Sequence, residues 1–83
     1  MEQQTIRLYP NPVPTGGQIW IRMPSVVGQV QVVLYNELGE QVFDQKGVEN
    51  ESTIALPNLA AGAYPYQIIG RTRIQRGILI VKG

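Results

Sequence analysis

The sequence of 83 residues contains neither cysteine nor histidine. Without cysteine the chain can form no disulfide and offers no thiolate to a metal ion. Without histidine it lacks the usual general base and the commonest transition-metal ligand. The six acidic residues are scattered, and Glu49-Asn50-Glu51 lacks the alternating ligands and the glycine of an EF-hand. We therefore expect no cofactor, no metal site and no catalysis.

Charge and long apolar runs are also scarce. Charged residues make up 16% of the chain, the formal net charge is +1, and 43% of the residues are hydrophobic. A net charge so close to zero gives no general attraction to nucleic acid or to an acidic membrane. No apolar run is long enough for a membrane span or a signal peptide. We expect the signal peptide upstream, in a longer parent chain. We expect one domain, residues 6–83, after a linker remnant at residues 1–5.

The pattern that the sequence does contain is a period-two alternation of apolar and polar residues, broken by clusters of glycine, proline and asparagine. No window has a convincing helical period. The alternation predicts seven strands, at residues 6–8, 19–23, 29–35, 40–45, 53–56, 63–69 and 73–82. A spacing of roughly ten to twelve residues is typical of an all-β fold, here a seven-stranded antiparallel immunoglobulin-like β-sandwich with Greek-key topology.

Three short motifs fit this prediction. Leu8-Tyr9-Pro10-Asn11-Pro12 predicts a stiff, extended start, because each proline fixes its own φ and disfavours helix at the residue before it. Asn36-Glu37-Leu38-Gly39 predicts a type I hairpin turn with Gly39 in the left-handed region. Leu59-Ala60-Ala61-Gly62-Ala63-Tyr64 matches a tyrosine corner, in which the phenol bonds backbone a few residues upstream. We expect Tyr64 to fix the fold rather than to bind a ligand.

Three other features could serve binding. The basic cluster Arg71, Arg73 and Arg76 either protects a hairpin from aggregation or contacts an acidic partner. Trp20 is assigned to the face opposite Ile19, where it would be an exposed platform for stacking sugars. If the two faces are reversed, it is a core tryptophan instead. The apolar run at residues 76–82 is either a strand buried on both faces or a strand with one face open to a partner.

Four motifs in order resemble the type A C-terminal sorting domain of the type IX secretion system, found in Bacteroidetes. They are the proline motif at residues 8–12, the hairpin at 33–42, the tyrosine corner at 59–64 and the closing strand at 78–82. Four positions depart from the family pattern: Asn36 replaces the aspartate common in the hairpin turn, Gly83 extends past the usual lysine-like end, and Pro65 and Gly77 interrupt the last strands. Pro65 cannot donate a ladder hydrogen bond and indicates an edge or a bulge, and Gly77 indicates a bulge or a close backbone approach.

The resemblance implies a transport signal at the end of a larger secreted cargo protein. In this family the parent crosses the inner membrane into the periplasm, and the folded domain then directs it through the outer-membrane translocon. A shuttle protein and a sortase-like peptidase commonly act next, and the cargo is left at the outer membrane or cell surface, or is secreted. The cut is expected upstream of Ile6, around or before residues 1–5.

The resemblance also assigns residues. It implies that the secretion machinery recognises the last strands, through Tyr64, Arg71, Arg73, Arg76, Gly77, Ile78, Leu79, Ile80, Val81 and Lys82. The residues that define the fold are Leu8, Tyr9, Pro10, Asn11, Pro12, Gly39, Leu59, Gly62 and Tyr64.

Two other functions stay open, together with self-association. The domain could be an accessory carbohydrate-binding or adhesion module of an extracellular enzyme, stacking sugar on Trp20, Tyr9 or Tyr35. It could also be a purely structural spacer. An exposed C-terminal edge strand would favour weak homodimers by strand pairing between copies.

Overall fold

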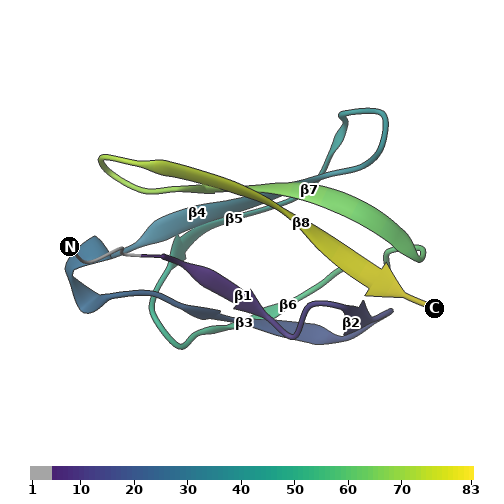
Figure 1. Cartoon of the computed structure of the whole chain (residues 1–83), viewed down its shortest axis with the longest axis horizontal. Coiled ribbons are helices and arrows are strands. Elements are labelled where there is room, and N and C mark those ends of the chain that lie inside the picture. The colour runs from purple at the N-terminus through teal and green to yellow at the C-terminus, as the bar shows by residue number, and fades with distance from the viewer. Residues whose placement is uncertain (1–4) are drawn as a thin grey trace.

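The computed structural model describes residues 5–83, and this part of the chain folds into two β-sheets that face each other (Figure 1). The predicted cut around residues 1–5 falls mostly outside the described residues. The described part contains one short 3-10 turn, η1 (Ser25–Val27), and eight strands. The strands are β1 (Arg7–Tyr9), β2 (Val13–Pro14), β3 (Gln18–Arg22), β4 (Val30–Tyr35), β5 (Gln41–Val48), β6 (Thr53–Ala55), β7 (Gly62–Ile69) and β8 (Ile74–Lys82).

The smaller sheet has the strand order β1-β3-β6, and the larger sheet has the order β2-β8-β7-β4-β5. All pairs are antiparallel except β2 and β8, which run parallel. Seven strands match the predicted ones, so the prediction of an all-β fold is confirmed. The prediction of seven antiparallel strands is wrong in two respects, because β2 is an eighth strand and its pairing is parallel. The immunoglobulin-like Greek key stays a prediction.

The missed strand β2 is only two residues long, too short to show any alternation in the sequence. It lies at the edge of its sheet, where a proline without an N–H group is tolerated. Its first residue, Val13, is completely buried between the sheets. A segment that reads as a proline-rich connection therefore supplies a core residue.

The hydrophobic core lies between the two sheets and follows the predicted alternation. Ile19, Ile21 and Met23 point inward from the smaller sheet and its end, and Val32 and Leu34 point inward from the larger sheet. Trp20 is 41% exposed on the outer face of β3, so it is not a core tryptophan. Among the described residues, no polar or charged residue is buried. Within residues 5–83 no helix is long and apolar enough to cross a membrane.

The β4–β5 hairpin confirms the predicted turn, and its second strand is longer than expected. The amide of Gly39 donates to the carbonyl of Asn36 at 3.0 Å, and Gly39 has a φ of 83°. The sequence predicts that this strand ends at Gln45, whereas β5 continues to Val48, which is 2% exposed. Gly47 has a φ of 68°, and the β4–β5 register shifts between Val30 and Val32, so an extra residue of β5 is accommodated as an irregularity.

The tyrosine corner is confirmed. The hydroxyl of Tyr64 donates to the carbonyl of Ala60 at 2.6 Å, and the tyrosine side chain is 9% exposed. At Pro65 the β7–β8 register continues without a shift, while the pairing of β7 with β4 ends at Tyr66. β7 therefore has a local edge at Pro65, one of the two alternatives that the sequence left open.

Candidate recognition surface

The last strand, β8, presents alternate side chains to solvent. Ile74, Ile78 and Ile80 are 52%, 56% and 39% exposed, and Arg76 and Lys82 point the same way. We call these five residues the β8 outer face. Of the two alternatives for this apolar run, the strand with one open face is confirmed.

The neighbouring strand β7 leaves the isoleucines of the β8 outer face uncovered. Ile80 is paired with Ala63, Ile78 with Pro65, and Arg76 with Gln67. Ala63 and Pro65 are exposed, and small or compact side chains cannot shield a neighbouring isoleucine from water. Three exposed isoleucines on one face, with Arg76 between Ile74 and Ile78 and Lys82 after Ile80, form the kind of surface that marks a protein interaction site.

Three of the ten predicted recognition residues point into the core. Leu79 and Val81 are 0% and 3% exposed, and Tyr64 is held in the tyrosine corner. Their side chains are packed between the sheets, where a partner of the folded domain does not reach them. Recognition through these three residues stays a prediction.

Gly77 lies directly opposite Tyr66 in the β7–β8 ladder, where there is no shift in register. A side chain at Gly77 would collide with the phenol of Tyr66. The predicted close approach is therefore confirmed, and the predicted bulge is not present. An aromatic ring laid over a strand glycine covers the backbone that the missing side chain leaves open.

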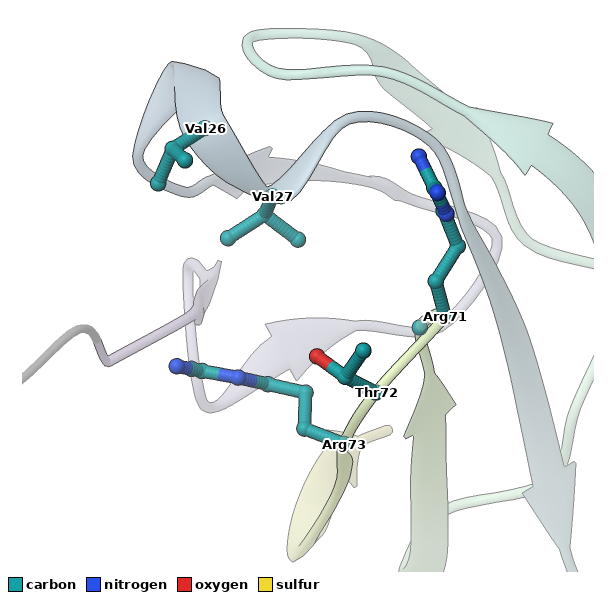
Figure 2. Close-up of a pocket in the computed structure, with 6 residues that line it drawn as sticks. Val26, Val27, Arg71, Thr72 and Arg73 are labelled. Atoms are coloured by element: carbon teal, nitrogen blue, oxygen red, sulfur yellow. The ribbon is translucent and has the colours of Figure 1, made fainter.

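The three arginines do not converge on one site. Arg71 and Arg73 line a shallow hollow of about 190 Å³ between the β7–β8 turn and η1. Figure 2 shows their guanidinium groups extending in different directions on either side of Thr72. Arg76 lies further along, on the β8 outer face. A contact between the arginines and an acidic partner stays a prediction, now with two separate positions.

The proline motif and its neighbours lie along the outer edge of β8. The peptide bonds before Pro10 and Pro12 are both cis. Asn11 forms hydrogen bonds to the backbone of Ile78 and Ile80, 67 and 69 residues away. The predicted open edge is thus largely occupied, so the structure removes the reason for expecting dimers through it; the dimer itself stays a prediction. Only the asparagine between two prolines marks this contact in the sequence.

Each residue of the acidic stretch after β5 forms a polar contact with another part of the fold. Glu49 accepts from Gln29 at 3.0 Å, Asn50 accepts from the amide of Met23 at 2.8 Å, and Glu51 pairs with Arg22 at 3.3 Å. In the described part of the chain, no three potential ligand side chains gather where they could hold a metal ion.

A family model described as "Secretion system C-terminal sorting domain" matches residues 7–82. No curated protein matches the chain. The chain therefore belongs to the C-terminal sorting domains, a class of secretion signals and not of enzymes. Within that class it is a sorting domain of the type IX secretion system. Such a domain implies a type IX system, a cargo protein on its N-terminal side, and export to the outer membrane or cell surface, or secretion.

Proposed function

We propose that this domain carries its cargo through the type IX outer-membrane translocon by means of the β8 outer face, after transit through the periplasm. The observation behind the proposal is the exposure of Ile74, Ile78 and Ile80 on one face of β8, while Leu79 and Val81 on its other face are buried. Covering one isoleucine contributes about 1.5–3 kcal/mol, so a partner that covers these isoleucines gains enough to select the domain.

The same proposal includes the later steps. A shuttle protein receives the exported chain, a sortase-like peptidase cuts before Ile6, and the cargo is anchored at the cell surface. The position of β1 supports the place of the cut. Leu8 is buried and the backbone of Ile6 is bonded to Gln75, so the fold protects residues from Ile6 onward and leaves the preceding linker as the place to cut.

The test fuses the domain to a reporter in a type IX-competent host and replaces Ile78 and Ile80 by serine. We expect surface reporter to fall about tenfold or more, which corresponds to 1.4 kcal/mol of lost binding, while reporter accumulates in the periplasm. Leu38→Ser is the matched control, because Leu38 is 83% exposed at the β4–β5 turn, away from β8. Circular dichroism checks that each variant is folded. Equal export of all three proteins would show that the β8 outer face is not read, and sequencing the surface reporter locates the cut.

A second candidate function rests on the outer face of the smaller sheet. Tyr9 and Trp20 are register partners in β1 and β3, and they are 38% and 41% exposed. Two neighbouring aromatic rings suit stacking on sugar, whereas Tyr35 lies in the other sheet and bonds Gln67. An accessory carbohydrate-binding module predicts retardation on polysaccharide gels that Trp20→Ala abolishes. Unretarded migration on plant and bacterial polysaccharides would remove this candidate.

We further propose that the two sheets form an immunoglobulin-like Greek key. The chain leaves the larger sheet after β5, pairs β6 with β3, and returns at β7, which supports such a crossover. The tyrosine corner stands where the chain returns. Proton–proton contacts across β3–β6 and across the parallel β2–β8 pair, measured by NMR, would test this topology, and their absence would refute it.

A further inference from the structure

The outer edge of β8 is covered largely by a side chain, where a neighbouring strand would otherwise lie. Nδ2 of Asn11 donates to the carbonyl of Ile78 at 2.9 Å, and the amide of Ile80 donates to Oδ1 of Asn11 at 3.0 Å. A carboxamide offers one donor group and one acceptor, as a peptide group does. Asn11 therefore takes both hydrogen bonds that a neighbouring strand would make at this point.

Further back along β8 the roles are reversed, because there a side chain of β8 bonds the backbone of the opposite segment. Nε2 of Gln75 donates to the carbonyl of Ile6 at 2.6 Å, and the amide of Ile6 donates to Oε1 of Gln75 at 3.1 Å. Between these two contacts the segment from Ile6 to Asn11 and β8 leave a cleft of about 610 Å³. Its lining includes Gln75, Asn11 and Tyr66. Because backbone groups of alternate residues face the same edge, those of Arg76 point outward here as Ile78 and Ile80 do.

True strand pairing on this edge is short. β2 contributes two register pairs, Val13 with Val81 and Pro14 with Lys82, and the amide of Thr15 donates to the carbonyl of Lys82 at 2.8 Å. On its other edge β8 is paired with β7 over eight residues. The segment at residues 10–15, which we call the proline segment, is thus the less firmly held neighbour of β8.

The proline segment also closes the sheet to any further strand. Since the amide of Thr15 faces β8, the nitrogen of Pro14 faces away from it by the alternation of a strand. A proline nitrogen carries no hydrogen, so this outer side lacks the donor that another strand would need there. A strand can therefore join the sheet on this side only by replacing the proline segment.

We propose that the outer edge of β8 is the docking site for an extended strand of the export machinery, which takes the place of the proline segment by β-augmentation. This inference rests on the proposed sorting function and adds where and how the partner binds. The backbone of the incoming strand would form hydrogen bonds with the carbonyl of Ile78 and the amide of Ile80, in place of the side chain of Asn11. Because Val13 is completely buried beside Val81, the partner strand must carry an apolar side chain that fills the same place.

Hydrogen exchange on the 83-residue domain tests whether Asn11 holds this edge. In Asn11→Ala we expect the amide of Ile80 to exchange at least about tenfold faster, a loss of 1.4 kcal/mol of protection. The amide of Leu79 faces β7 by alternation and serves as the internal control. Unchanged protection of Ile80 would overturn the assignment of the edge to Asn11.

A cross-link tests whether the edge must be freed for export. The chain has no cysteine, so Pro14→Cys with Lys82→Cys places a single disulfide between β2 and β8 in the oxidising periplasm. The matched pair Pro14→Ser with Lys82→Ser carries the same two changes without a link and sets the reference.

We expect the linked pair to export a cysteine-free reporter at least about tenfold less than the serine pair. Equal export of the two pairs would overturn the docking role of the edge and leave the β8 outer face as the contact. If the unaltered domain exports no reporter, the sorting function itself fails, and the docking role fails with it.

Discussion

At the scale of single residues, the hydroxyl of Tyr64 fixes the position of the backbone that precedes β7. It satisfies the carbonyl of Ala60 at 2.6 Å in the connection that brings the chain back from β6 to β7. A carbonyl that loses its partner in a half-buried place costs more than one that water can reach.

Tyr64→Phe should therefore lower the free energy of unfolding by about 1–2 kcal/mol. Urea denaturation followed by tyrosine and tryptophan fluorescence measures this. Tyr35→Phe is the control, because its bond is longer, at 3.2 Å, and its acceptor is the side chain of Gln67, which can turn to water when the hydroxyl is lost. We expect a loss below about 0.5 kcal/mol. Similar losses in both variants would contradict a special role for the corner.

The second residue-scale feature is the pairing of Gly77 with the ring of Tyr66. Gly77→Ala forces the ring away from β8, and we expect a destabilisation of about 1–3 kcal/mol from this overpacking. In a Tyr66→Ala background the same change should cost much less, because the ring is gone. A double-mutant cycle by urea denaturation measures the difference, and additive effects would show that the ring and the glycine are independent.

At the scale of elements, the turn of the β4–β5 hairpin is fixed by hydrogen bonds of its own residues rather than by burial. The side chain of Asn36 accepts from the amides of Leu38 and Glu40, both at 2.9 Å, and its Nδ2 donates to Glu40 at 2.8 Å. Gly39 then turns the chain with a φ of 83°, which other residues adopt only with strain.

Gly39→Ala should destabilise the domain by about 1–2 kcal/mol, through backbone strain alone, because no atom lies within 4 Å of an added Cβ. Gly62→Ala is the matched control. Gly62 has no positive φ, and an added Cβ would lie 3.9 Å from Tyr64, an ordinary contact. We expect its effect on the melting temperature to be small. A larger loss in the control than in Gly39→Ala would reverse this explanation.

The sequence predicts elements well where side chains alternate over five or more residues, as in β3, β4 and β7. It fails at β2, where Val13 stands between two prolines and nothing local marks it as buried. It also fails at Val48, because Gly47 before it resembles a loop residue. The contacts of Asn11 with β8 join residues 67 and 69 positions apart, and such pairing depends on the folded sheet. The split of β8 into a buried and an exposed half follows from alternation and was within reach of the sequence.

At the scale of the whole molecule, an 83-residue domain has little stability to spare, roughly 4–12 kcal/mol at 0.05–0.15 kcal/mol per residue. Removing residues 79–83 takes Leu79 and Val81 out of the core, and each contributes about 1.5–3 kcal/mol. It also removes Val81 and Lys82, the residues of β8 with which β2 pairs.

The domain without residues 79–83 should therefore be largely unfolded at 25 °C, as judged by near-ultraviolet circular dichroism and hydrogen exchange. Removal of Gly83 alone is the control, since Gly83 is exposed and lies outside β8, and should leave the spectrum unchanged. A cooperative transition like that of the full domain would contradict the expected loss of the core. A truncation of this length removes the fold together with any signal that the fold carries.

The bonds between Ile6 and Gln75 join the first strand region to the last across 69 residues. On a ribosome, nothing can complete this closure until β8 has left the exit tunnel. Nascent chains stalled before Ile74 should accordingly remain sensitive to protease throughout the domain. Any parent chain that breaks off early then carries no folded domain of this kind, so the closed domain marks a polypeptide whose synthesis has passed through its last strand.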